Sequence, residues 1–173
     1  MTLPRYERGL TRHPLGDLPK GMRGAERSVA VPEYAQTAVG ALITSWEFKR
    51  RAGFETPGGE PVAGQEGRLG TTVLGMHFAE PIRVVWADEH GFGYETRPGH
   101  PIYGEESFVL EDGRFTARSI SRPSTLRWRL LTPVLRAMQR GVFRRYISSV
   151  ESEIDRCRQV REPGVSDRPG NAK

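Results

Sequence analysis

The sequence predicts an α+β domain in which a curved antiparallel sheet wraps around a long C-terminal helix, with a short helix after the first strand. Three observations support this fold class. Apolar residues alternate with a period of two across much of residues 69–119, which is typical of strands. An apolar stripe with helical spacing runs from Leu135 to Ile154. A shorter helical pattern lies between Pro32 and Trp46, directly after a β-rich run.

The length of 173 residues fits one domain with tails. Residues 1–26 hold three prolines and four glycines without clear periodicity, so they are interpreted as an irregular lead-in. Residues 27–158 carry the periodic patterns and form the predicted single domain. Residues 159–173 are polar and contain proline and glycine, which predicts a disordered tail.

The chain has a net charge of +5 and a sequence pI near 9.8. This charge would allow attraction to nucleic acid or anionic lipid, but the default interpretation is a soluble domain with an arginine-rich surface, so no nucleic-acid partner is expected. No apolar run approaches the roughly 18 residues of a membrane span. Cys157 is the single cysteine, and the sequence shows no signal peptide, which together predict a cytoplasmic protein. Without paired metal-ligand motifs, neither a metal nor a cofactor is expected. The oligomeric state stays open.

The first half of the chain reads as a strand, a helix and a loop. Residues 27–31 form the predicted first strand, and Pro32 suits the first position of the helix that follows. Residues 47–53 are ambiguous between a helix end and a strand. Residues 56–67 are rich in glycine and proline, which predicts a loop. A phosphate-binding role for this loop would require a GK[ST] sequence, which does not follow it.

Successive strands are predicted from Leu69 onward. Pro81 is expected to end one strand, and residues 82–86, 91–97, 104–112 and 114–121 supply the others. Asp112-Gly113 between two β-patterned runs is a strong hairpin signal. Short connections of this kind predict an antiparallel meander, which needs a helix to cover one face.

The last helix is expected to begin at Thr132-Pro133, with threonine as the N-cap and proline at the first helical position. Its apolar stripe, including Leu135 and Met138, is expected to pack on the sheet. A space that remains between a curled sheet and a single helix is a natural cavity for an apolar or amphipathic ligand. The opposite face is rich in arginine and is either solvated or a contact surface for an anionic partner.

Most of the concentrated polar chemistry lies in the segment 91–110. His100 lies in a Pro-Gly-His-Pro loop, where rigid flanks hold the imidazole in place. Together with Glu105, His100 is a candidate for acid–base catalysis. The alternative is that His100 only ties down the loop by bonding a carbonyl or a carboxylate.

Glu105 and Glu106 are adjacent in a predicted strand, so they face opposite sides of the sheet. The inward carboxylate would need a partner, for which Arg122 and His100 are available. Tyr94 offers an apolar ring and one hydroxyl, which suits a cavity wall. The predicted ligand-binding set is therefore Tyr94, His100, Glu105 and Arg122.

Several blocks of the chain are similar to a known family. GFGYETRPGHPIYGEESF, the preceding PIRVVW, the Ser-Arg-Pro at 121–123 and the later TPVLRAMQR resemble the uncharacterised family called domain of unknown function nineteen-ninety, over about residues 5–153. Glu95 and Arg97 depart from the glycine and leucine expected there. The resemblance implies a relative of the helix-grip superfamily of the START and Bet v 1 type, and it implies no activity.

Three functions are consistent with these patterns. The first is a module that binds a small apolar or amphipathic molecule between the sheet and the C-terminal helix. The second is an enzyme of the same fold that uses His100 and Glu105 for proton transfer. The third is a protein that binds a partner through its basic C-terminal helix.

Overall fold

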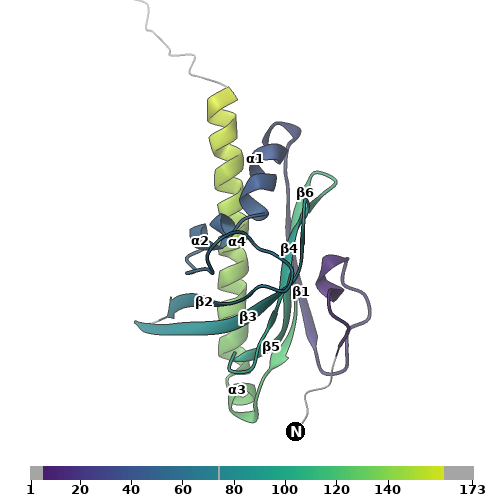
Figure 1. Ribbon diagram of the computed structural model, residues 1–173, viewed down its shortest axis with the longest axis vertical. Helices are drawn as coiled ribbons and strands as arrows, with labels where there is room; N and C mark the ends of the chain where they lie inside the picture. Colours follow the sequence, from purple (N-terminus) through teal and green to yellow (C-terminus); the bar gives the residue numbers. More distant parts are fainter. Residues whose placement is uncertain (1–5, 74, 162–173) are drawn as a thin grey trace, which may run out of the picture.

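The structure is a computed structural model that describes residues 6–73 and 75–161. Six strands form one antiparallel sheet in the order β1-β6-β5-β4-β3-β2, which curves beside a long C-terminal helix (Figure 1). This arrangement confirms the predicted fold class. In chain order the elements are η1 (Leu10–Arg12), β1 (Arg23–Ala30), α1 (Glu33–Ile43), α2 (Glu47–Arg51), β2 (Glu66–Val73), β3 (Met76–Asp88), β4 (Gly91–Thr96), β5 (Ile102–Glu111), β6 (Arg114–Pro123), α3 (Leu126–Leu130) and α4 (Thr132–Arg161).

Strands β2 to β6 are a meander in which each strand pairs with the next, and β1 closes the free edge of β6. The predicted hairpin between β5 and β6 is present, with Glu111 opposite Arg114. Asp112 and Gly113 both have positive φ values, 50° and 66°. Two positive φ values are what a two-residue hairpin turn of this twist requires, so the Asp-Gly pair sets the register of both strands.

Pro81 does not end a strand, contrary to the prediction, but lies inside β3 opposite Arg68 of β2. Its carbonyl accepts a hydrogen bond from the backbone N–H of Arg97, which follows the last residue of β4. In an antiparallel strand a residue's N–H and C=O point to the same neighbour, so the missing N–H of Pro81 faces the end of β4. The missing N–H therefore costs the sheet few backbone hydrogen bonds, and β3 can continue through Pro81.

Two glycines of the central block allow neighbouring strands to pack closely. A Cβ atom at Gly104 would lie 1.9 Å from the carbonyl oxygen of Ile120 on β6. A Cβ atom at Gly93 would lie 2.5 Å from Nε1 of Trp86 on β3. No side chain fits either position without moving its neighbours, which gives a physical reason for glycine at both.

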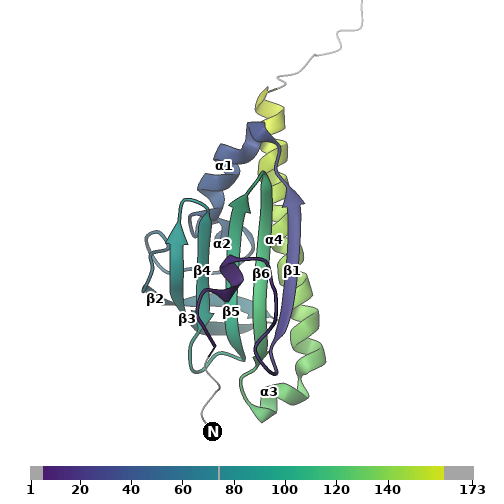
Figure 2. The same cartoon turned by 90° about the vertical axis from the view of Figure 1, so that its right-hand side faces the viewer.

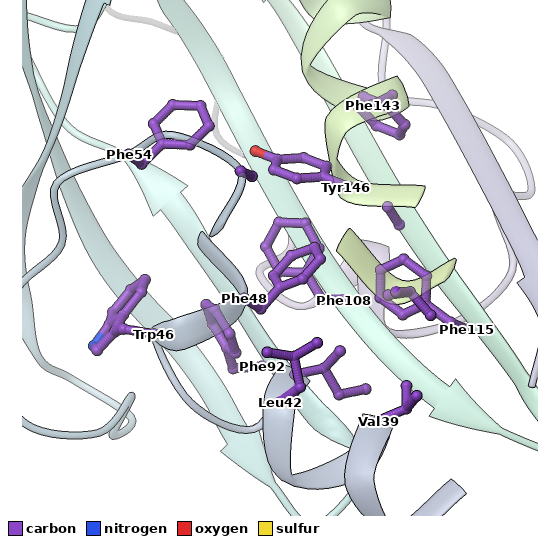
Figure 3. Packing of buried hydrophobic residues seen from close by; sticks show 14 of the residues in the cluster. Val39, Leu42, Trp46, Phe48, Phe54, Phe92, Phe108, Phe115, Phe143 and Tyr146 are labelled. Atoms are coloured by element: carbon purple, nitrogen blue, oxygen red, sulfur yellow. The ribbon is translucent and has the colours of Figure 1, made fainter. Parts of the chain in front are cut away.

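Helix α4 covers one face of the sheet, the inner face. Helix α1 packs between α4 and the sheet at one end of the molecule, and α2 lies beside α4 and contacts both α1 and α4 (Figures 1 and 2). The core lies there and is rich in aromatic side chains. It includes Trp46, Phe48, Phe54, Phe92, Phe108, Phe115, Phe143 and Tyr146 (Figure 3). These rings fill the space between the sheet and this part of α4.

The two halves of α4 differ in burial. Its buried residues begin at Phe143 and continue to Ile154. Leu135 is only half-buried, and Met138 is 37% exposed. The predicted core stripe is therefore correct for the second half of the helix and not for the first half. None of the described helices is both long enough and apolar enough to cross a membrane.

The ends of the domain extend past the predicted boundaries. β1 begins at Arg23, four residues before the predicted start, and η1 of the lead-in packs on β5, β6 and β4. At the other end, residues 159–161 belong to α4. The rest of the predicted disordered tail, residues 162–173, lies outside the described residues.

Candidate functional site

The register of β4 and β5 decides which side chains of the central block share a face. Tyr94 lies opposite Glu106, and Glu95 lies opposite Glu105. Because side chains alternate along a strand, Tyr94 and Glu106 point to the inner face, whereas Glu95 and Glu105 point to the outer face. The structure therefore does not bring Tyr94 and Glu105 together, and the inward carboxylate is that of Glu106.

Glu105 holds the lead-in against the outer face of the sheet. Its Oε2 accepts the backbone N–H of Gly9 at 2.8 Å, and its Oε1 accepts the backbone N–H and the hydroxyl of Thr11 at 3.0 and 2.5 Å. Ser107 continues this contact by donating its hydroxyl to the carbonyl of Thr11. Both carboxylate oxygens of Glu105 are thus occupied by protein groups, and the side chain is 2% exposed.

His100 is buried in the loop between β4 and β5. Its Nδ1 accepts the backbone N–H of Ile102 at 3.1 Å, and its Nε2 lies 3.2 Å from Oε2 of Glu80 on β3. Glu80 precedes the buried Ile82 by two residues on this strand, so it belongs to the inner face. The geometry matches the alternative in which His100 ties the loop to a carboxylate, and that carboxylate is Glu80.

Arg122 lies on the outer face, opposite Tyr103 of β5. Its guanidinium carbon is 5.1 Å from the centre of the Tyr103 ring, which is a cation–π contact. Of the four predicted ligand-binding residues, Tyr94 is therefore on the inner face, His100 is in a loop bonded to an inner-face residue, and Glu105 and Arg122 are on the outer face.

A buried polar cluster on the inner face is centred on Lys49 of α2. Its Nζ lies 2.6 Å from the hydroxyl of Tyr94 and 2.9 Å from Oε2 of Glu106, and it also bonds the hydroxyl of Tyr146 on α4. The Tyr94 hydroxyl contacts the same carboxylate oxygen, and that of Tyr146 lies 3.1 Å from it. Four elements, α2, β4, β5 and α4, thus contribute one side chain each. We call these four residues the Lys49 cluster.

Aromatic rings surround the ammonium group. Nζ of Lys49 lies 4.5–4.8 Å from the ring centres of four residues, which are Phe54, Tyr94, Phe108 and Tyr146. Figure 3 shows Phe54, Phe108 and Tyr146 gathered at this part of the core. The negative ring faces and the carboxylate of Glu106 together stabilise a cation that has no contact with water.

Burial shifts the pKa values of three members of the cluster. Desolvation lowers the pKa of Lys49, although the nearby Glu106 carboxylate opposes this shift. Desolvation also raises the pKa values of Tyr94 and Tyr146 well above the usual 10.0, and the negative charge of Glu106 adds to both shifts. The two hydroxyls therefore stay protonated and able to donate hydrogen bonds over the whole physiological range.

The charged groups around the Lys49 cluster differ in exposure. The side chain of Lys49 is 0% exposed, whereas that of Glu106 is 15% exposed and that of Glu80 is 21% exposed. Both carboxylates are therefore more exposed than the ammonium of Lys49.

Two hollows of the surface lie elsewhere. One, of about 720 Å³, is lined by α1 and by the turns that follow β3 and β5. The other, of about 470 Å³, lies between the lead-in and the outer face near Ile120. Neither hollow includes a member of the Lys49 cluster, and the first is wide open to solvent. The Lys49 cluster therefore lies in a different part of the molecule from both hollows.

Sequence reasoning missed Lys49, Glu80 and Tyr146 as members of a site. Lys49 lies in the segment that was ambiguous between helix and strand, within the run Phe-Lys-Arg-Arg. Tyr146 belonged to the predicted apolar stripe, and only its hydroxyl could have suggested a polar partner. Glu80 stands next to the proline that was expected to end its strand.

The fold is a helix-grip architecture, a curved antiparallel sheet covered by a long C-terminal helix, with a buried ion pair beneath the helix. The match to the family described as Domain of unknown function (DUF1990) covers residues 6–149, so the chain belongs to this family. This confirms the family resemblance of the central block. No curated protein matches the chain.

Solved structures of the same fold are similar over most of the chain. A protein from Arthrobacter aurescens has a TM-score of 0.52 and 10% identity, covering 79% of this chain and 87% of that chain. Major latex-like protein 151 from Panax ginseng has a TM-score of 0.51 and 11% identity, covering 77% and 94%. A protein from Thermus thermophilus has a TM-score of 0.50 and 16% identity, covering 77% and 96%. At such identities these similarities show the fold alone.

Proposed function

We propose that the protein binds a small amphipathic molecule between the inner face of the sheet and the first half of α4. The observation that carries this proposal is the Lys49 cluster, a fully buried ammonium whose carboxylate partner, Glu106, is 15% exposed. A buried ion pair contributes little to stability compared with apolar side chains of the same volume. Ligand binding would explain why the protein has a buried ion pair that contributes little to its stability.

Apolar side chains of α4 are available to contact an apolar ligand body. Leu135 and Met138 lie in the first half of α4, and neither is fully buried by the protein itself. The inner face opposite them carries small residues, Gly104 of β5 and Ser119 of β6. The hydrogen bond from Gln139 to the hydroxyl of Ser119, at 3.1 Å, connects this part of α4 to the sheet.

The polar groups favour a ligand that donates a hydrogen bond. The three N–H groups of Lys49 are matched by Tyr94, Glu106 and Tyr146, so the ammonium has no donor left. The side-chain hydrogen bonds of Glu106 with Lys49, Tyr94 and Tyr146 all use Oε2, and we infer that Oε1 is the oxygen that a ligand would contact. A hydroxyl or an amine is the group that this oxygen would bind.

The geometry gives no support to proton transfer by His100 and Glu105. Both ring nitrogens of His100 already face protein partners, and both oxygens of Glu105 are held by the lead-in. A general base needs a free lone pair within reach of the substrate proton. The binding function is therefore the better candidate.

Two measurements test the proposal. Native mass spectrometry of the freshly purified protein should reveal a co-purifying small molecule, and the apolar amine 1-N-phenylnaphthylamine should gain fluorescence on binding. Met138→Glu places a charge on the apolar wall at a half-exposed position and should weaken probe binding strongly without unfolding the protein. Val62→Glu, at a 61% exposed loop position, is the matched control. A protein that yields no ligand and does not bind the probe would rule the proposal out.

A further inference from the structure

A second surface is independent of the ligand site. It is the corner where α3 and the first turn of α4 meet, at the end of the molecule opposite α1 (Figures 1 and 2). Four apolar side chains are exposed there. They are Leu126 at 75%, Leu130 at 84%, Leu131 at 43% and Val134 at 54%. We call this surface the α3 corner.

The α3 corner is built rigidly enough to present these side chains. Thr125 caps the start of α3 by accepting the backbone N–H of Trp128. Ser124 bonds the carbonyl of Pro101 through both its N–H and its hydroxyl, at 3.0 and 2.9 Å. Thr132 bonds the carbonyl of Arg129 at 2.6 Å and so closes the turn into α4. The exposed leucines therefore belong to an ordered surface.

Arginines stand among the apolar residues. Arg127 and Arg129 of α3 and Arg136 of α4 are exposed, and none of them has an ion-pair partner within the described part of the chain. From Gly113 to Val150 the sequence has nine arginines and no acidic residue. The remainder of the chain has 17 basic and 21 acidic residues. The positive net charge of the protein thus comes entirely from the segment that contains this corner.

We propose that the α3 corner docks the protein on an anionic lipid bilayer. Exposed leucines would enter the boundary between headgroups and acyl chains, and the arginines beside them would bind the anionic headgroups. A second copy of this chain fits less well, since its arginines would meet like charges. A nucleic acid would leave the leucines in contact with water and phosphate, without any gain from their burial.

The position of the corner connects docking to the ligand site, although the docking proposal does not depend on it. The first half of α4 begins at the corner and forms one wall of the proposed binding region. A molecule bound at the membrane would then have this wall near the bilayer surface. Because docking is measured on vesicles without any ligand, its failure and the failure of the ligand proposal are distinguishable.

Co-sedimentation of the full chain with phosphatidylcholine vesicles, with and without phosphatidylserine, tests the proposal. Binding is expected only with phosphatidylserine and should weaken with salt. The double change Arg127→Gln and Arg129→Gln should reduce the affinity about fivefold per arginine, and Leu130→Ser should reduce it by about tenfold. Arg68→Gln on β2 and Val62→Ser are the controls, since both residues are exposed and neither belongs to α3 or α4.

Each of the other outcomes overturns the proposal. Equal binding to neutral vesicles would show that charge plays no part, and binding that survives Leu130→Ser would show that the apolar residues play none. No binding to either vesicle would exclude docking. A dimer in sedimentation velocity that Leu130→Ser dissociates would identify a second copy as the occupant. Tighter binding to duplex DNA than to phosphatidylserine vesicles would identify nucleic acid instead.

Discussion

Tyr94 and Glu106 face each other across β4 and β5, and both contact the ammonium of Lys49 beneath α4. The ion pair is unequal, because the side chain of Lys49 is 0% exposed and that of Glu106 is 15% exposed. Loss of the carboxylate would leave a buried cation without compensation, whereas loss of the ammonium would leave a carboxylate that water can still reach. This asymmetry leads to the first prediction.

Glu106→Leu should lower the free energy of unfolding by about 3–5 kcal/mol, the range for removing one partner of a buried pair. Lys49→Met should cost clearly less, and the double variant should recover much of the loss. Urea denaturation of the three variants forms a double-mutant cycle that checks this. Equal costs for the two single variants, with simple additivity, would mean that the pair is not coupled.

The pKa shifts of the cluster predict how stability changes in alkali. Burial places the pKa of Lys49 below its usual 10.5, so between the two values the unfolded chain binds more protons than the folded protein. The contribution of Lys49 to the free energy of unfolding therefore rises with pH across this window. The raised pKa values of Tyr94 and Tyr146 act the other way, because above pH 10.0 the unfolded tyrosines lose protons that the folded ones keep.

Chemical denaturation at a series of pH values, on the wild type and on Lys49→Met, separates the two effects. The wild type should show the rising contribution below about pH 10, and Lys49→Met should lack it. Both proteins should lose stability above that pH, since both keep the two tyrosines. Parallel curves over the whole range would show that the environment of Lys49 does not perturb its titration.

His100 is expected to be structural. His100→Ala removes the acceptor of the Ile102 N–H and the partner of Glu80, both in a buried place, so it should cost about 1–3 kcal/mol. His90→Ala is the matched control, since its ring is 45% exposed, and it should stay within about 0.5 kcal/mol of the wild type. Thermal unfolding of both variants gives the comparison. An unchanged melting temperature for His100→Ala would contradict the assigned role.

The two halves of α4 should respond differently to truncation. Phe143 is 3% exposed within the aromatic core, so Phe143→Ala should cost about 3–5 kcal/mol. Met138, five residues earlier, is 37% exposed, and Met138→Ala should cost less than about 1 kcal/mol in the absence of ligand. Urea denaturation of both variants measures the difference. Equal costs would mean that the helix packs on the sheet along its whole length.

The sequence predicts the fold well because the fold depends on local patterns. The period-two runs, the Asp112-Gly113 turn and the stripe of the last helix each specify one element or connection. The strand end predicted at Pro81 was wrong. Whether a strand tolerates a proline depends on where the neighbouring strand ends, and the local sequence does not contain this information. The exposure of Leu135 and Met138 is likewise decided by what lies across from the helix.

The site was less predictable because its members come from distant elements. Alternation showed that Glu105 and Glu106 face opposite sides, but only the pairing register with Tyr94 shows which one points inward. The partners of Glu105 lie in the lead-in, which has no periodicity to indicate a contact. Lys49 resembled a solvated residue of a basic run, and only its partners on the sheet and on α4 show that it is buried.

The last prediction concerns the contact between Glu105 and the lead-in. Glu105→Gln keeps the size of the side chain but replaces one acceptor oxygen by an NH₂ group, which would then face the N–H donors of Gly9 or Thr11. Hydrogen bonds to a charged group contribute about 1.5–3 kcal/mol each, so the lead-in should detach from the outer face more often. Trypsin should then cleave after Arg12 faster than in the wild type, because detachment exposes this bond. Glu111→Gln, at an exposed position on the same strand, is the control. Equal cleavage rates in the wild type and Glu105→Gln would show that other contacts, such as that of Ser107 with the Thr11 carbonyl, hold the segment.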